Sequence, residues 1–295
     1  MHGWRSGQSW LVVGQMDKVQ ERGGLNQDSS APPTKHGTRG SESRKRFRLL
    51  MGADSVIDLG RRGKVMQWIQ ERGFVLGIAS LGLLVIGSYL GLFWAPPDVA
   101  QGDAMRILYV HVPTVMVAYL AFFLVLVGSA LYLWKRDTKW DRLAGASAEI
   151  GVFFTALTIA VGSIWAKPIW GVWWTWDPRL TTTAVLFVIY VGYLMLRTLQ
   201  PDPGARARQS AVVGIVGFID IPIVHESVLW WRSLHQGPTF GGLSGPTMDG
   251  RMEAALVVNM LAFLVLFVFL LGQRLRLAGL EQRRDDLLWE EMSSV

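Results

Sequence analysis

Three histidines stand in apolar or aromatic surroundings in this sequence: His111, His225 and His235. The other two histidines lie in a polar N-terminal stretch and carry no such signal. A neutral imidazole is a common metal ligand, and haem iron accepts axial histidines readily. A single histidine in such a place is more often structural. His111 and His225, which flank a tryptophan-rich segment, together favour a haem site more strongly than either does alone.

Tryptophan is concentrated between His111 and His225. Five of them fall within twelve residues, namely Trp165, Trp170, Trp173, Trp174 and Trp176. The indole ring has a large rigid face and a polar N–H at its edge. The run can therefore form a platform for a flat, apolar ligand. Asp177 follows directly and could orient a turn or accept an imidazole or indole N–H. The competing interpretation is an aromatic belt, which predicts tryptophan at both membrane faces.

Several other chemistries are excluded. The chain has no cysteine, so it has no thiol nucleophile, no Cys-ligated metal and no Cys-x-x-Cys-His haem attachment site. It contains no phosphate-binding loop of the GxxxxGK[ST] type, no HExxH and no G-x-S-x-G. We therefore predict a ligand-binding protein rather than an enzyme, and no nucleic-acid partner.

The chain has 295 residues, of which 51% are hydrophobic and 18% are charged, against about 25% charged in ordinary soluble domains. The apolar residues are gathered in long runs without charge, which is typical of a polytopic membrane protein. We predict an all-α fold with six transmembrane helices. The spans are 74–94, 113–134, 150–166, 180–196, 211–224 and 254–272. Pro113 is predicted in the first turn of its helix, where a missing N–H costs nothing.

Lysine and arginine are distributed unevenly between the two ends of these spans. Fifteen lie near one set of ends and five near the other, which predicts cytoplasmic termini and three outer loops at 95–112, 167–179 and 225–253. Eight tryptophans then lie at the outer ends against three at the inner ends, which disfavours a simple belt. The outer cations are Arg106, Lys167, Arg179 and Arg232. Arginine suits the carboxylates of haem, although Lys167 and Arg232 could equally contact lipid headgroups.

The sequence divides into three parts. Residues 1–66 form a polar extension that we predict to be disordered, or to follow from a misassigned start. Residues 67–275 form the six-helix domain, with the tryptophan-rich loop at 165–180, and residues 276–295 form a cytoplasmic tail. Asp220, an ionisable group inside the fifth span, is either functional or in contact with interfacial water.

The run Trp170-Gly-Val-Trp-Trp-Thr-Trp-Asp177 resembles the "WWD" signature of haem-handling membrane proteins. Together with Arg-Ile-Leu-Tyr-Val-His111-Val-Pro and Pro-Ile-Val-His225-Glu-Ser-Val-Leu-Trp-Trp, followed by Leu-His-Gln-Gly237, it is similar to the cytochrome c maturation protein C family (CcmC, haem exporter protein C) over about residues 70 to 275. Glu226, beside His225, has no firm counterpart in the family pattern.

The resemblance implies a site and a set of partners. It implies haem b bound at the periplasmic face of the bacterial inner membrane, with His111 and His225 as axial ligands. It implies that the WWD loop holds the haem and presents it to a haem chaperone. The loop residues are Trp170, Trp173, Trp174, Trp176 and Asp177. Arg106 and Arg179 match positions near the haem.

The implied partners are a membrane-anchored haem chaperone (CcmE-like), a small helper subunit (CcmD-like) and an ABC transporter pair (CcmA/CcmB-like), in the biogenesis of c-type cytochromes. Three alternatives stay open at this point: a haem transporter or exporter, an electron-transfer subunit resembling cytochrome b, and a structural assembly subunit that uses tryptophan as an anchor. Such electron-transfer subunits bury histidine pairs inside helices, whereas both predicted ligands are expected at helix ends.

Overall fold

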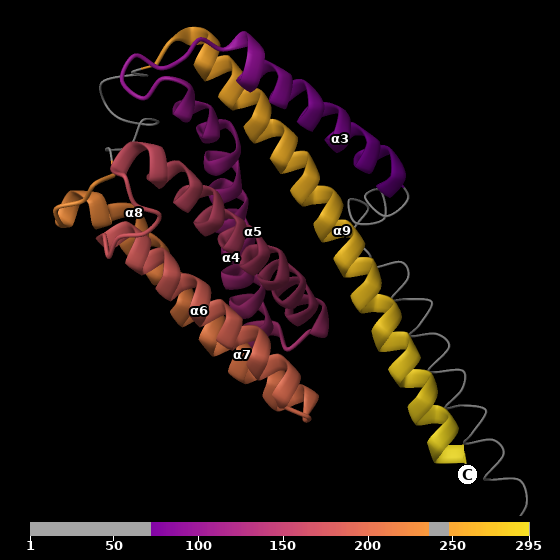
Figure 1. Ribbon diagram of the computed structural model, residues 1–295. Coiled ribbons are helices and arrows are strands. Elements are labelled where there is room, and N and C mark those ends of the chain that lie inside the picture. The colour runs from indigo at the N-terminus through magenta and orange to yellow at the C-terminus, as the bar shows by residue number, and fades with distance from the viewer. Residues whose placement is uncertain (1–71, 236–247, 295) are drawn as a thin grey trace, which may run out of the picture. The chain divides into compact units, whose positions relative to one another are not determined.

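The computed structural model describes residues 72–235 and 248–294, which belong to one compact unit of the chain (Figure 1). The described residues form helices and contain no strand. The elements are α3 (Gly73–Tyr89), the π-helical turn η1 (Leu90–Trp94), the 3₁₀ turn η2 (Asp103–Ile107), α4 (Leu108–Lys135), α5 (Thr138–Trp170), α6 (Pro178–Leu199), α7 (Pro203–Phe218), α8 (Asp220–Trp230) and α9 (Gly250–Ser294). The predicted polar extension lies outside the described residues.

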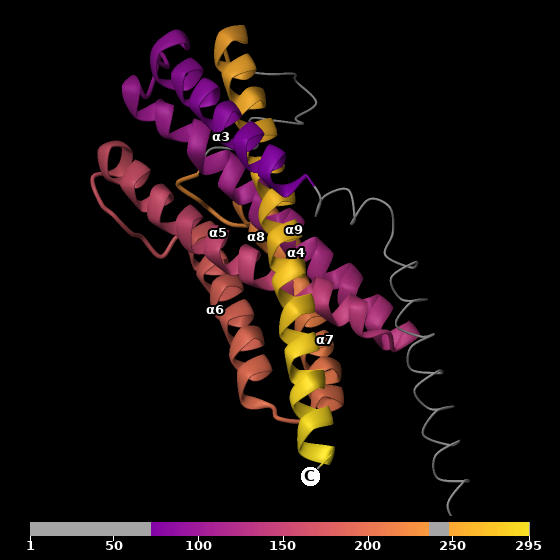
Figure 2. The same ribbon diagram turned by 90° about the vertical axis from the view of Figure 1, so that its right-hand side faces the viewer.

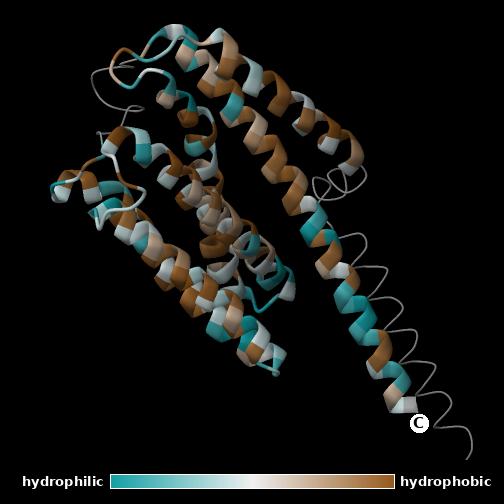
Figure 3. Cartoon of the chain, in the orientation of Figure 1, coloured by the Kyte–Doolittle hydropathy of each residue, from teal (hydrophilic) through white to brown (hydrophobic). Residues whose placement is uncertain are grey.

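Six helical segments are long and apolar enough to cross a membrane, which confirms the predicted all-α fold with six spans. They are Gly73–Trp94, Asp103–Lys135, Thr138–Trp170, Pro178–Leu199, Pro203–Trp230 and Gly250–Ser293. Apolar residues cover most of their length, and the last part of α9 turns hydrophilic (Figure 3). The protein is thus a multi-pass membrane protein, and the predicted C-terminal tail continues α9 as helix.

Three of the spans begin before the predicted apolar runs, at residues that cap the helices. Asp137 accepts a hydrogen bond from Lys139 N at the start of α5, and Asp177 accepts one from Arg179 N at the start of α6. Asp202 does the same for Ala205 N in α7. Such caps satisfy amide groups that the first turn leaves free.

Pro113 is placed differently from the prediction, and Pro222 interrupts the fifth predicted span. Pro113 is the sixth residue of α4, because η2 runs directly into that helix. His111 consequently lies within α4 and not in a loop. In the fifth span the helix breaks between Phe218 and Asp220. A proline ring clashes with the carbonyl four residues earlier, so Pro222 explains why α7 ends at Phe218. His225 therefore lies inside a separate short helix, α8.

The antiparallel pair α4 and α5 forms the centre of the bundle, with α7 and α6 on one side and α9 on the other, and α3 lies along α9 (Figures 1 and 2). At the buried junction of α4 and α6, Phe122 and Tyr190 stack with ring centroids 3.7 Å apart. Near the end of α6 that is opposite Asp177, Arg197 forms a bidentate ion pair with Asp141 of α5, at 2.5 and 3.0 Å. The aromatic stack thus packs the middle of the bundle, and the ion pair lies near the end opposite Asp177.

Candidate functional site

A cavity of about 580 Å³ opens among α4, α5, α6, α8 and α9, toward the end of the bundle that carries the tryptophan-rich loop. Its volume falls within the range of about 300–1,000 Å³ that is usual for small-molecule sites. Most of its wall is apolar. The aromatic and ionisable residues of its wall are His111, Tyr119, Trp165, Trp170, Arg179, His225 and His235. From His111 to Tyr119 the wall follows eight residues of α4, about 12 Å of helix.

His111 sits in a notch of α5 that a glycine provides. A Cβ atom at Gly162 would lie 2.9 Å from His111 Cε1 and 3.5 Å from Nδ1, so the imidazole occupies the space of a missing side chain. The ring also meets Trp165 edge to face, with centroids 5.6 Å apart. Nδ1 is buried and makes no hydrogen bond to any described residue. Packing therefore fixes the ring in place at the cavity wall.

His235 is held by hydrogen bonds and aromatic packing. Its Nδ1 lies 3.1 Å from Asp177 Oδ1, and its ring meets Trp170 edge to face with centroids 4.8 Å apart. Burial lowers the pKa of His235 below its ordinary value despite the neighbouring Asp177, so the imidazole is neutral at pH 7. Because an ionised carboxylate only accepts hydrogen bonds, Nδ1 carries the proton. Nε2 then carries no proton and has a free lone pair, and a neutral imidazole binds a metal through such a nitrogen.

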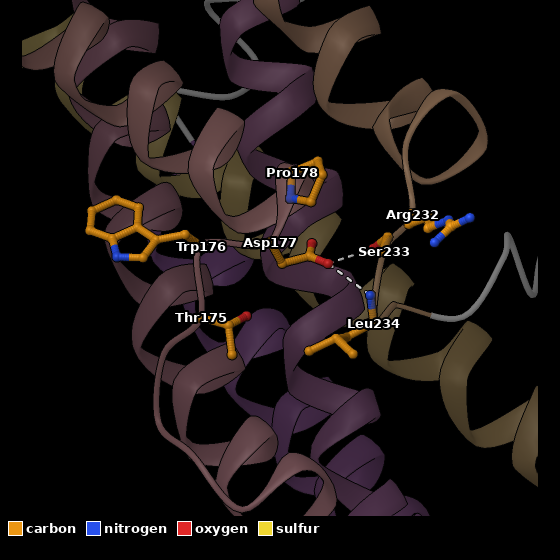
Figure 4. Close-up of a pocket in the computed structure, with 7 residues that line it drawn as sticks. All are labelled: Thr175, Trp176, Asp177, Pro178, Arg232, Ser233 and Leu234. Carbon is orange, nitrogen blue, oxygen red and sulfur yellow. Dashed lines mark hydrogen bonds between the residues drawn. The ribbon is translucent and has the colours of Figure 1, made fainter.

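Asp177 joins the tryptophan-rich loop to the segment that follows α8. Its side chain is 2% exposed. Oδ2 accepts hydrogen bonds from Ser233 Oγ and Leu234 N, both at 2.8 Å (Figure 4), while Oδ1 accepts one from Arg179 N at 3.0 Å. Burial opposes ionisation, but these donors together hold the pKa of Asp177 below its ordinary value. The bridge is therefore intact at neutral pH and weakens only as acidification protonates the carboxyl.

Arg179 lines the cavity at the first turn of α6. Its Nη2 donates a hydrogen bond to the backbone carbonyl of His225, at 3.0 Å. The contact ties α6 to α8 and keeps a cation at the cavity wall. His225 also lines the cavity, and the residue is exposed. No ring contact or side-chain hydrogen bond orients its imidazole among the described residues.

Arg106 lies apart from the other predicted site residues and contacts the end of the preceding helix. Its Nη1 donates to the carbonyl oxygens of Gly91 and Ala95, at 2.9 and 3.1 Å, and its Nε pairs with Asp103 at 2.9 Å. These bonds satisfy carbonyls at the end of the π-helical turn η1. Arg106 does not line the cavity.

The tryptophans of the predicted platform divide into two sets. Trp170 lines the cavity together with Trp165. Trp173 is 57% exposed and lies under the Lys167 ammonium, which is 6.0 Å from the ring centroid. Trp174 packs edge to face against Trp176, which is 82% exposed. The second set thus forms an outward-facing surface next to the cavity.

Sequence reasoning left two residues of this cavity without a role. His235 lies in the third predicted outer loop, and the sequence Leu-His-Gln-Gly around it contributed to the family resemblance, but the residue was given no role. Trp165 was counted in the tryptophan run but given no contact. Asp220 does not line the cavity, and its Oδ2 is buried without a hydrogen bond to a described residue.

Fold and site together define a class: a polytopic helical membrane protein with an apolar, imidazole-lined cavity at one end of its bundle. A family model described as CcmC, heme exporter protein C, matches residues 55–290. The chain belongs to this family, as the sequence resemblance predicted.

Individual relatives agree. The chain is 36% identical over 212 residues to heme exporter protein C of Bradyrhizobium diazoefficiens, which covers 72% of this chain and 78% of that protein. It is 35% identical over 211 residues to heme exporter protein C of Escherichia coli K12, covering 71% and 85% respectively. A putative cytochrome c biosynthesis ccmC-like mitochondrial protein of Arabidopsis thaliana is 36% identical over 197 residues, covering 66% and 74%. These names describe an exporter and a biosynthesis component, and none of them names a catalysed reaction.

Proposed function

We propose that the protein binds haem in the 580 Å³ cavity and delivers it for the biogenesis of c-type cytochromes. The observation that carries the proposal is the convergence of His111, His225 and His235 on one apolar cavity beside Trp165 and Trp170. Haem is the cargo of the protein and not a catalytic group, in keeping with the family names.

The residues of the cavity fit an iron porphyrin. A porphyrin ring is flat and apolar, and the wall supplies aliphatic side chains and two indoles. The two carboxylates of haem b need cations, and Arg179 is the arginine on the wall. The glycine notch behind the ring holds His111 in place, and its buried Nδ1, which has no hydrogen-bond partner among the described residues, is available to a metal. We keep Arg179 as the carboxylate partner, and we assign Arg106 to supporting the outer loop.

His111 is the first proposed axial ligand. For the second, sequence reasoning assigned His225, and the geometry favours His235. A metal-binding histidine usually donates its other N–H to a carboxylate or carbonyl, which fixes the tautomer and the ring orientation. His235 has this arrangement with Asp177, whereas His225 has no such partner among the described residues. His225 stays the alternative second ligand.

The proposed setting is the bacterial inner membrane, with both termini in the cytoplasm and the cavity facing the periplasm. The excess of lysine and arginine at the opposite ends of the spans supports this orientation. The exposed tryptophans Trp173 and Trp176, together with Trp174, are then placed to meet a membrane-anchored haem chaperone (CcmE-like). A helper subunit (CcmD-like) and an ABC transporter pair (CcmA/CcmB-like) complete the proposed system.

The test is to purify the full-length protein from cells that make haem, with and without the co-expressed chaperone. We expect haem to co-purify and to appear covalently on the chaperone only when both proteins are present. Protein without haem, or a chaperone loaded equally well in its absence, would contradict the proposal. Reversible redox titration coupled to a quinone would instead favour an electron-transfer subunit, and haem flux through the protein alone in liposomes would favour a transporter.

Gly162→Ala tests whether the notch positions His111. The added Cβ would lie 2.9 Å from Cε1 and must displace the ring. Overpacking of this kind costs about 1–3 kcal/mol, so haem affinity should fall roughly ten-fold in an equilibrium haem titration. Gly192→Ala in α6 is the matched control, since its Cβ would meet nothing within 4 Å. Equal haem affinity in the two variants would show that the notch plays no part.

A further inference from the structure

The last part of α9 carries an apolar stripe that no described residue covers. Phe269 and Gln273 of α9 contact α3, and four leucines follow on the same side of the helix. These leucines, which we call the α9 stripe, are Leu277, Leu280, Leu287 and Leu288. Their exposed fractions lie between 49% and 65%. Because α9 continues past the first residues of α3 (Figures 1 and 2), the stripe extends the surface that α3 covers.

The contacts between α3 and α9 follow one antiparallel register. A Cβ atom at Gly73 would lie 2.5 Å from Gln273 Nε2, and one at Gly87 would lie 2.6 Å from Asn259 Oδ1. Fourteen residues forward along α3 therefore correspond to fourteen residues back along α9. A register that holds over this length predicts which residues would face the α9 stripe if the packing continued before Gly73.

Neither lipid nor α5 covers the α9 stripe. The surrounding helix is strongly polar (Figure 3), and charged side chains are costly in the hydrocarbon of a bilayer. The side of α9 that meets α5 is a different one. There Arg274 Nη2 donates to Glu149 Oε1 at 2.7 Å, and Arg142 Nη1 donates to Gln282 Oε1 at 2.6 Å. Burial of the exposed leucines by another protein segment would be favourable.

The sequence that precedes α3 fits the stripe in this register. Residues 61–71 lie outside the described residues, so their sequence alone enters the argument. Counted from the contact at Gly73, Ile69 falls opposite Leu277 and Met66 falls opposite Leu280. As a helix, the eleven residues would extend about 16 Å, whereas the seven residues of α9 that lead from the contact to the second leucine extend about 10 Å. The segment is therefore long enough and apolar at the required positions.

The charges of the two segments are complementary. Residues 61–71 contain three cations and one acid, whereas the last fourteen residues of α9 contain five acids and two arginines. In the same register Arg61 falls opposite Asp285. Arg62 falls opposite Arg284, whose Nη2 lies 2.8 Å from Asp285 Oδ1. The basic end of the segment thus meets the acidic end of α9.

We propose that residues 61–71 bind along the α9 stripe and continue the packing of α3 against α9. The occupant is a segment of the same chain, because the chain that leads into Gly73 starts from the stripe and is tethered there at a high effective concentration. A second copy would have to reach the same leucines past this segment. The proposal places residues 61–66 with the helical domain and not with the predicted polar extension. The two segments form an arm at the end of the bundle opposite the proposed haem cavity.

Paired cysteines test the register directly, because the chain has no cysteine of its own. Two double variants of the full-length protein, Met66→Cys with Leu280→Cys and Ile69→Cys with Leu277→Cys, are oxidised in membranes. We expect each to form a disulfide within one chain, since a disulfide requires Cβ atoms about 4 Å apart. The measurement is the fraction of monomer in which neither cysteine reacts with a maleimide–polyethylene glycol. Trp68→Cys with Leu280→Cys is the control, because residues 66 and 68 point to opposite sides of a helix, and it should cross-link at least five-fold less.

The other occupants give distinct results. A disulfide-linked dimer would assign the stripe to a second copy of the chain, and cysteines that remain reactive in the monomer would leave it to a different protein. Either result, or equal cross-linking of the Trp68 control, would overturn the proposal. The measurement does not involve haem, so its outcome is independent of the proposed function.

Proteolysis of the full-length protein provides a second measurement without cysteines. Leu280→Asp should release the segment, and trypsin should then cleave at Arg61, Arg62 and Lys64 about five-fold faster, because cleavage follows the population of the open form. Trp289→Asp is the matched control, since Trp289 is 70% exposed on the same helix but points away from the stripe. Equal cleavage rates in the two variants would contradict the proposal.

Discussion

Replacing His111 by alanine is expected to yield folded protein that purifies without haem. The imidazole is held in a notch of α5 by Gly162 and Trp165, and alanine leaves no ligand nitrogen at that position of the wall. Haem with two axial histidines is six-coordinate, and its absorption spectrum reports the loss of one ligand directly. The measurement is the visible spectrum of the oxidised and reduced protein. Haem and imidazole added together should restore a six-coordinate spectrum in part, because imidazole can enter the space that the side chain leaves.

His235→Ala and His225→Ala separate the two candidates for the second ligand. We expect His235→Ala to lose the six-coordinate spectrum and His225→Ala to keep it, with at most a modest loss of haem. The physical reason is the orienting contact with Asp177, which His235 has. The opposite pattern would restore His225 as the ligand. A spectrum unchanged in all three variants would remove the histidines from the site altogether.

Asp177→Ala is expected to have the second largest effect. The substitution leaves Ser233 Oγ, Leu234 N and Arg179 N without their acceptor and frees His235. Each buried donor left unpaired costs about 1–3 kcal/mol. Haem affinity should fall by more than ten-fold, and the segment around Ser233 should become sensitive to added protease. Haem titration and limited proteolysis are the two measurements.

Asp137→Ala is the matched control for this prediction. Asp137 also caps a helix, accepting a hydrogen bond from Lys139 N at 3.0 Å, but it lies at the opposite end of the bundle. Loss of a helix cap alone costs about 1 kcal/mol. Asp177→Asn keeps the shape and only part of the acceptor capacity, so it should fall between the two. Equal haem affinity in the Asp177→Ala and Asp137→Ala variants would show that Asp177 acts only as a cap.

The architecture was predictable from sequence because the chain has six long apolar runs, five of them without a charge, and in a membrane such runs form helices that satisfy their own backbone groups. The membership of the family was predictable from the motifs around His111, His225 and the tryptophan run. Helix ends were less predictable, since they depend on caps such as Asp137 and Asp177 that lie outside the apolar runs. Pro222 indicated a possible helix break in the fifth span. The direction in which His225 points after that break could not be predicted.

The side-chain arrangement of the site was harder to predict. Trp170 and Trp173 are three residues apart, yet the first lines the cavity and the second faces outward, because α5 ends at Trp170 and Gly171, which follows, has a positive φ of 76°. Arg106 was expected near the haem carboxylates, and the π-helical turn η1 provides the carbonyls that engage it instead. The pairing of Asp177 with His235 joins residues 58 positions apart, which no local pattern reveals.

The Asp177 bridge makes two surface segments into one mechanical unit. The same carboxylate follows Trp176 in the chain and holds the imidazole of His235. On the proposed function, a partner protein that binds the outer indole of Trp176 would contact the residue next to Asp177, which orients His235 at the cavity wall. A single side chain therefore separates the outer surface from the proposed haem ligand.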